Sequence, residues 1–171
     1  MIWNDYFLAL FDSCCATYRG GIRDLDQFFS GEDLAFLATI GCQAREFFDS
    51  VEDCCDEDTP SASTALLVAA VRRDYFLTVQ KGVTSHHVFT RDELPSFGHE
   101  QDGIAYLPRI LAKARAKLRG ELDPDIMFGC GGDRNFLRKH GSIHPADFLR
   151  HVWAAGDNNA KLAAWIKSHA A

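Results

Sequence analysis

The chain has 171 residues, of which 47% are hydrophobic and 25% charged, a composition that is typical of one globular domain and excludes wholesale disorder. Its first residues lack the basic start and apolar run of a signal peptide, and the apolar run over residues 64–71 is too short to cross a bilayer. We therefore expect a cytoplasmic protein without a membrane anchor.

The net charge of −6 conceals an uneven distribution along the chain. Residues 1–103 carry 7 basic and 18 acidic side chains, whereas residues 104–171 carry 11 basic and 6 acidic ones. Either the two halves pack together and partly neutralise each other, or the second half presents a basic surface to phosphate or nucleic acid. Because the basic excess is modest, we do not expect nucleic acid as the partner.

The cysteines form two adjacent pairs and two singles: Cys14, Cys15, Cys42, Cys54, Cys55 and Cys130. This spacing matches no zinc-binding pattern, and a reducing cytosol keeps thiols free. We expect structural thiols and no bound metal, although a metal site built from dispersed cysteines stays open.

Helix signals dominate the first half of the chain. An opening helix is predicted over about residues 3–17, ended by two glycines. Ser30 and Asp33 have the spacing of a capping box that opens a helix over about residues 32–55, in which Gly41 lies on the apolar stripe. Thr59 and Pro60 then predict the N-cap and first turn of a helix over residues 61–79.

The second half is also predicted to be helical. A helix over residues 108–119 ends at Gly120, and three shorter helices follow, the second of them capped by His144. Residues 75–90 are either a small β-hairpin or a helix end followed by a loop. The sequence thus predicts an all-α, or mainly α, compact multi-helix single domain over residues 1–171. Its internal seam lies near residues 94–103, between an acidic N-terminal helical half and a basic C-terminal helical half.

The helix over residues 61–79 carries charges that a buried helix cannot easily accommodate. Apolar side chains cover every face of its projection, and Arg73 falls on the same side as Leu66 and Leu77. A buried guanidinium needs a carboxylate or a ligand. Arg72, Arg73 and Asp74 are therefore candidate ligand-binding residues, with an internal salt bridge as the alternative.

A glycine-rich turn precedes the next candidate site. Glycines let main-chain N–H groups converge, and a helix N-terminus adds partial positive charge. Arg134 could bind a phosphate or carboxylate, and Cys130 could be a reactive thiol with a lowered pKa. In the alternative, the glycines form a tight turn and Asp133 caps the helix. The candidate residues are Cys130, Gly131, Gly132, Asp133 and Arg134.

The common catalytic and phosphate-binding motifs are missing from the sequence, so catalytic residues and cofactors stay unassigned. The acidic residues between Glu46 and Asp58 are expected to form a solvated face. Five basic residues without an acid lie between Arg109 and Arg119, and some of them should face solvent.

Several segments of the second half together resemble a known family. They are Tyr106-Leu107-Pro108-Arg109-Ile110-Leu111 with Lys113-Ala114-Arg115, Phe128-Gly129-Cys130, Asp133-Arg134-Asn135-Phe136-Leu137, and Asp147-Phe148-Leu149. These residues resemble the bacterial domain-of-unknown-function family numbered 5069, most clearly over the C-terminal part. The resemblance implies a bacterial cytosolic protein and brings no reaction, substrate or cofactor.

The leading functional hypothesis is a cytosolic protein that binds a small anionic ligand and could also be an enzyme. It requires the segment around Arg72 and Arg73 to meet the turn over residues 129–134. The alternative is a non-enzymatic protein–protein interaction module, and a homo-oligomer is possible in either case.

Overall fold

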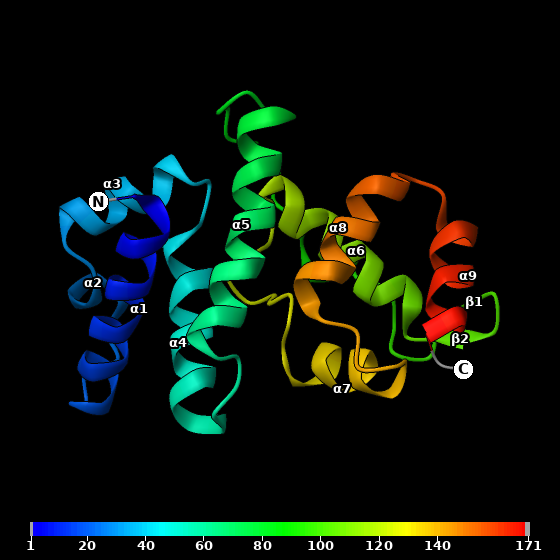
Figure 1. The fold of residues 1–171 in the computed structure, drawn as a ribbon, viewed down its shortest axis with the longest axis horizontal. Helices are drawn as coiled ribbons and strands as arrows, with labels where there is room; N and C mark the ends of the chain where they lie inside the picture. The colour runs from blue at the N-terminus through cyan, green and yellow to red at the C-terminus, as the bar shows by residue number, and fades with distance from the viewer. Residues whose placement is uncertain (1, 170–171) are drawn as a thin grey trace. The chain divides into compact units, whose positions relative to one another are not determined.

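The computed structural model describes residues 2–169 of the chain, which forms two compact units, Met1–Thr84 and Ser85–Ala171. Helices make up most of both units, and within the described residues the β-structure consists of one two-stranded hairpin and one isolated bridge (Figure 1). The predicted all-α class is therefore confirmed. Whether the two units act as one domain stays a prediction.

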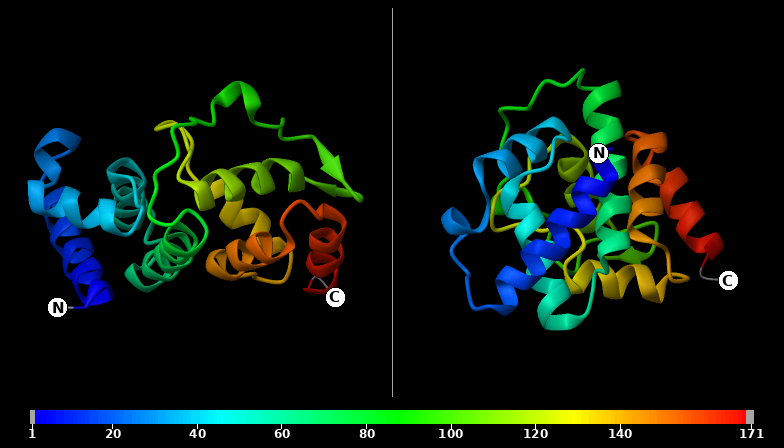
Figure 2. Two further views of the ribbon diagram at one scale, coloured as in Figure 1. Left: turned by 90° about the horizontal axis from the view of Figure 1, so that it is seen from above. Right: turned by 60° about the vertical axis from the view of Figure 1, so that its left-hand side comes forward.

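In the described part of unit 1 the regular secondary structure is helical. The helices are α1 (Trp3–Arg19), α2 (Leu25–Phe28), α3 (Gly31–Thr39), α4 (Ala44–Glu57) and α5 (Ala62–Thr78). Helix α1 packs against α4 and α5, and α1 and α4 lie side by side in Figures 1 and 2. The contact between α1 and α4 is aromatic, because the ring of Phe47 lies 5.1 Å from that of Phe7 and 5.8 Å from that of Phe11. Such edge-on pairs add stability beyond the burial of their area.

The predicted helix over residues 32–55 is two helices, with a break between Thr39 and Ala44. Its start is confirmed, since Ser30 and Asp33 form both hydrogen bonds of the capping box. The break occurs at Gly41, which adopts a φ of +64°. A Cβ atom at Gly41 would lie 2.6 Å from the Phe76 ring, so glycine permits both the left-handed turn and the close approach of α5.

Helix α5 also differs from its prediction in two respects. Its N-cap is Ser61, whose hydroxyl accepts the main-chain N–H of Thr64, so Thr59 and Pro60 lie before the helix. The helix is not buried on every face, because Leu67 and Leu77 are exposed. An apolar projection shows which faces could be buried, whereas the neighbouring helices decide which of them are.

Unit 2 is built around α6 (Leu107–Arg119). Its other elements are η1 (Arg91–Glu93), β1 (Glu100–Gln101), β2 (Ile104–Ala105), α7 (Gly131–Lys139), α8 (Pro145–Ala155) and α9 (Asn159–His169). The predicted apolar stripe of α6 is confirmed as a fully buried face that packs against α8, which in turn packs against α9. Gly120 ends α6 with a φ of +68°, and the His144 ring accepts the N–H of Ala146 at the start of α8, as predicted.

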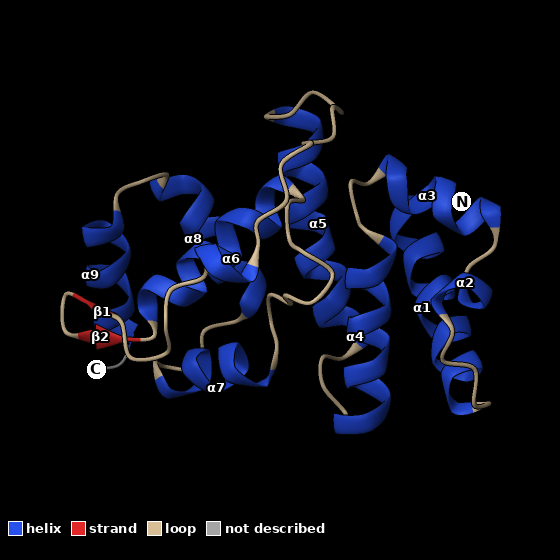
Figure 3. Ribbon diagram, turned by 180° about the vertical axis from the view of Figure 1, so that it is seen from behind, coloured by secondary structure: helices blue, strands red, loops and turns tan. Residues whose placement is uncertain are grey.

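The hairpin predicted near residues 75–90 is wrong in position. Helix α5 runs to Thr78 and a loop follows, in agreement with the alternative prediction, while the hairpin lies at residues 100–105 (Figure 3). Asp102 and Gly103 connect its strands with φ values of +52° and +74°. Two successive positive φ values are what a tight two-residue hairpin requires, and Asp-Gly is a preferred pair for it.

The boundary between the two units falls at Thr84/Ser85, and residues 94–103 lie within unit 2. Along residues 2–169, none of the helices combines the length and the apolar character that crossing a membrane demands.

Candidate functional site

The first predicted segment lies on α5 in unit 1, and its buried residue is Arg72 rather than Arg73. Arg72 is 1% exposed and donates to the side-chain oxygen of Gln80 at 2.6 Å, with its guanidinium 5.2 Å from the Phe76 ring. Four buried residues of α5 follow alternating spacings of four and three, namely Ala65, Ala69, Arg72 and Phe76, and Val71 is buried beside Arg72. The projection placed Arg73 on the buried side because it could not distinguish between two apolar faces.

Arg73 and Asp74 lie at the surface of unit 1. The Arg73 guanidinium is 3.4 Å from the Asp74 carboxylate and lies over the Trp3 ring at 5.0 Å. These contacts hold Arg73 in place within its own unit. Since the glycine-rich turn belongs to unit 2, the predicted meeting of the two segments stays a prediction.

The glycine-rich turn leads directly into α7. Gly129 has a φ of +91°, Cys130 is the N-cap, and the helix begins at Gly131. The prediction that Asp133 is the cap is therefore wrong. Asp133 is the third residue of the helix, and its carboxylate reaches back to accept the N–H of Gly129 at 2.8 Å. The Asp133 carboxylate therefore fixes the turn from within the first turn of α7.

A cluster of four polar side chains, here called the Lys113 cluster, lies beneath this turn: Tyr106, Lys113, Cys130 and Asp133. The Lys113 ammonium is 2.7 Å from Asp133 Oδ2, 3.0 Å from the main-chain oxygen of Met127 and 3.2 Å from Cys130 Sγ. The Lys113 side chain is 4% exposed and that of Asp133 is 0% exposed. The ammonium has three hydrogens, and these three acceptors match them.

Tyr106 completes the surroundings of the Asp133 carboxylate. Its hydroxyl donates to Asp133 Oδ1 at 2.8 Å. Burial raises the pKa of Tyr106, and the charge and hydrogen bond of Asp133 raise it further, so the hydroxyl remains a donor. Tyr106 is also the N-cap of α6 with a φ of +71°, an uncommon conformation for a residue other than glycine. Asp133 thus holds the start of α6 and the start of α7 together.

Cys130 and its neighbouring glycines bring the cluster to the surface. Cys130 is half-buried, whereas Gly131 and Gly132 are exposed. A Cβ atom at Gly132 would lie 2.9 Å from the Tyr106 hydroxyl, so the main chain passes close over the tyrosine. The exposed part of the site is therefore the open first turn of a helix, which begins at the half-buried Cys130 and lies above a buried ion pair.

The sequence pattern singled out Cys130 and Asp133 but not their partners. Tyr106 appears only among the residues of the family resemblance, and Lys113 appears there and as one member of the basic run. Tyr106 lies 27 positions from Asp133. A buried contact over such separations has no local sequence signal.

The other basic residues of α6 also make contacts within unit 2. Arg109 donates to the main-chain oxygen of Pro95 at 2.7 Å, and Arg115 donates to that of Gly156 at 2.8 Å. Arg119 pairs with Glu121 at 2.5 Å, and Lys117 is buried. The basic run therefore stabilises its own unit instead of forming a uniform basic stripe.

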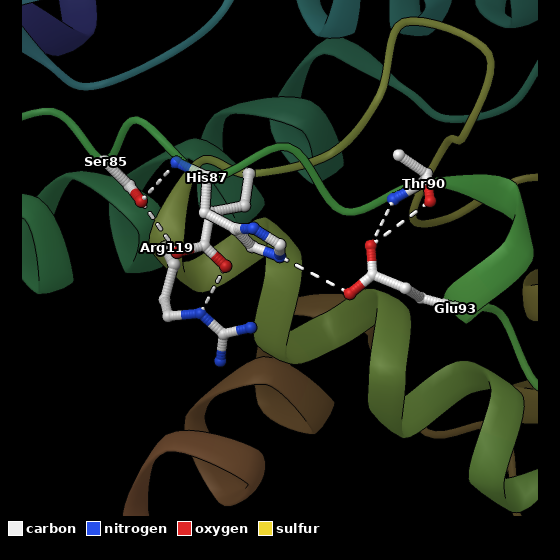
Figure 4. Close-up of polar contacts among 6 residues, drawn as sticks. Ser85, His87, Thr90, Glu93 and Arg119 are labelled. Carbon is white, nitrogen blue, oxygen red and sulfur yellow. Dashed lines mark hydrogen bonds and ion pairs between the residues drawn. The ribbon is translucent and has the colours of Figure 1, made fainter.

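A second polar cluster lies where the loop before η1 meets the end of α6 (Figure 4). Ser85 donates to Glu121 Oε1 at 2.8 Å and accepts the main-chain N–H of His87, while the His87 ring faces Glu93 at 3.5 Å. These residue types occur in catalytic triads, but here the serine hydroxyl bonds to a carboxylate and not to the imidazole. The contacts anchor a loop.

The remaining thiols and the acidic face belong to unit 1. Burial raises the pKa values of Cys14 and Cys15 to about 12, which supports a structural role for these two thiols. The acidic face is less solvated than predicted, since Glu46 is buried, and burial raises the pKa of Asp49 to about 6. Over the part of the chain that the structure describes, no group of three or more His, Cys, Asp or Glu side chains could hold a metal ion.

Comparison with known proteins adds one finding. No curated protein and no solved structure matches the chain. Residues 92–171, which contain the whole Lys113 cluster, match the family model described as Domain of unknown function (DUF5069).

Proposed function

We propose that unit 2 binds a small anionic ligand at the first turn of α7. The observation that carries the proposal is that this turn is open. Its N-cap, Cys130, makes no side-chain hydrogen bond to the helix, and Gly131 and Gly132 are exposed. The first N–H groups of a helix have no partner within the helix and carry partial positive charge, so an anion is their natural ligand.

The charges around the turn support an anion as well. Asp133 would oppose one if its charge were uncompensated, but Lys113 neutralises it at 2.7 Å. Arg134 follows on the same helix, half-buried, and donates to the main-chain oxygen of Gly129 at 2.8 Å. Its guanidinium therefore adds positive charge beside the exposed glycines. Arg72, Arg73 and Asp74 are not needed for this site.

The chemistry of the ligand follows from these donors. Main-chain N–H groups and a guanidinium recognise carboxylate or phosphate oxygens. The thiol of Cys130 lies at the edge of the same turn, so the site could also carry out a reaction on such a ligand. A bacterial source and a cytoplasmic location fit the family resemblance and the free thiols, and we keep both as part of the proposal.

The test is a titration of the 15N-labelled full chain with inorganic phosphate at constant ionic strength, followed by NMR. We expect the amide signals of Gly131 and Gly132 to shift saturably, and Arg134→Gln to weaken binding. Arg138→Gln is the matched control, because it removes the same charge from the exposed last turn of the same helix. Equal effects of the two variants, or signals that do not move, would contradict the proposal.

Native mass spectrometry of the purified chain tests the alternative. A copurifying anion would support ligand binding and would identify the ligand. A dimer or a protein partner without any small molecule, together with unmoved glycine signals, would favour an interaction module.

A further inference from the structure

We propose that Lys113 and Cys130 form a covalent nitrogen–sulfur cross-link when a hydroperoxide oxidises Cys130. This inference goes beyond anion binding and does not depend on it. It rests on one juxtaposition, in which the Lys113 Nζ lies 3.2 Å from the Cys130 Sγ. One atom belongs to α6 and the other to the N-cap of α7, and the Asp133 carboxylate and the Met127 carbonyl fix the ammonium in this contact.

The exposure of the two side chains differs in the way that the reaction requires. Cys130 is half-buried, so it is the member of the pair that a small hydroperoxide approaches from solvent, whereas the Lys113 side chain is 4% exposed. Cys130 is also the only cysteine of residues 85–171, and no second thiol of its own unit can capture the oxidised sulfur. The nearest nucleophile is therefore the lysine amine.

In the first step, the thiol sulfur attacks the outer oxygen of the hydroperoxide. The oxygen–oxygen bond breaks, an alcohol or water leaves with the thiol proton, and Cys130 becomes a sulfenic acid. The sulfur is oxidised and the peroxide is reduced. Sulfenic acids condense with nitrogen nucleophiles to give sulfenamides.

In the second step, Asp133 Oδ2 accepts one proton from the Lys113 ammonium, to which it is already hydrogen-bonded at 2.7 Å. The freed lone pair of Nζ attacks Sγ, and the sulfur–oxygen bond breaks. Hydroxide leaves as water with the second nitrogen proton. The product is a neutral sulfenamide beside a protonated Asp133, so the net charge of the pair is unchanged. The link joins α6 to the first turn of α7, and a thiol reductant reverses it.

The experiment treats the full chain with hydrogen peroxide in phosphate-free buffer, alkylates the remaining thiols and maps tryptic peptides by mass spectrometry. We expect a linked pair of peptides containing Lys113 and Cys130, lighter by two hydrogens than the sum of the two free peptides. Cleavage after Lys113 should be lost and then restored by dithiothreitol.

Lys113→Arg is the informative variant, because it keeps a cation next to Asp133 but has no primary amine. In this variant Cys130 should accumulate as a sulfenic acid that dimedone traps, and then as a sulfinic acid. Cys54 is an internal control, because it is also half-buried and Lys81 is the single lysine in the sequence of its unit. It should be oxidised without a cross-link to lysine.

The proposal is overturned if wild-type Cys130 gives sulfinic acid as readily as the Lys113→Arg variant and no linked peptide forms. Should the variant fail to fold by circular dichroism, the mass of the wild-type peptides decides alone. The absence of phosphate separates this result from the anion titration, so that each proposal can fail without the other.

Discussion

Replacing Lys113 with methionine keeps a long apolar side chain but removes the ammonium, and it leaves the Asp133 carboxylate buried without its cation. Breaking a buried ion pair from one side costs about 3–5 kcal/mol, because the remaining charge is desolvated and unpaired. Two hydrogen bonds to Asp133 remain, one from Tyr106 and one from Gly129. We therefore expect a loss of about 3 kcal/mol in the free energy of unfolding of unit 2, at the lower end of that range.

The matched control is the exposed pair of Arg150 and Asp147 in the same unit. Its charged atoms approach to 2.8 Å, compared with 2.7 Å in the buried pair, but its side chains are 49% and 57% exposed. Water screens such a pair, so Arg150→Ala should cost about 0.5 kcal/mol or less. The two variants therefore remove ion pairs of similar length, one of which is buried and the other exposed to solvent.

The assay is urea unfolding at pH 7 in a Trp3→Phe background, in which the remaining tryptophans, Trp153 and Trp165, both report on unit 2. The midpoint should fall in Lys113→Met while the dependence on urea concentration stays the same. Adding Asp133→Asn should then cost less than the sum of the two single changes, because each single variant strands the other charge. If Lys113→Met lowers the free energy of unfolding no more than Arg150→Ala does, the claim that the buried pair stabilises unit 2 is refuted.

Three further predictions concern single residues. Gly41→Ala should destabilise unit 1 by about 3 kcal/mol, because the new side chain is strained at a left-handed φ and overpacks against Phe76. Gly21→Ala should cost only about 1 kcal/mol, because Gly21 has the left-handed φ but open space around it, and thermal unfolding of the two variants compares them. Asp49 has its pKa raised by burial to about 6, so the folded chain keeps a proton that the unfolded chain releases above about pH 4. Its contribution to stability is present below pH 4 and is lost as the pH rises through 6, so Asp49→Asn should gain stability relative to wild type over that window, and a constant difference would contradict this. Tyr106→Phe removes one donor to the buried Asp133 and should cost about 1–3 kcal/mol in urea unfolding, whereas a neutral effect would show that the bond is not needed.

Much of the fold could be predicted because its determinants are local. The capping box of Ser30 and Asp33, the left-handed Gly120 and the His144 cap each act within a few residues, and each is confirmed. The apolar stripe of α6 is likewise a property of its own spacing. The Asp102–Gly103 turn is equally local, because Asp-Gly is a pair that favours a two-residue hairpin turn.

The remaining features of the fold and the site depend on partners that are distant in sequence. The break at Gly41 follows from the approach of Phe76, and the burial of Arg72 rather than Arg73 follows from which face of α5 meets its neighbours. At the site, the local sequence indicates a glycine turn that leads into a helix, with a cysteine and an aspartate beside the turn. The partnership of Asp133 with Lys113 and Tyr106 required α6 and α7 to pack together, because a buried charge is stable only where packing supplies its counter-charge and donors.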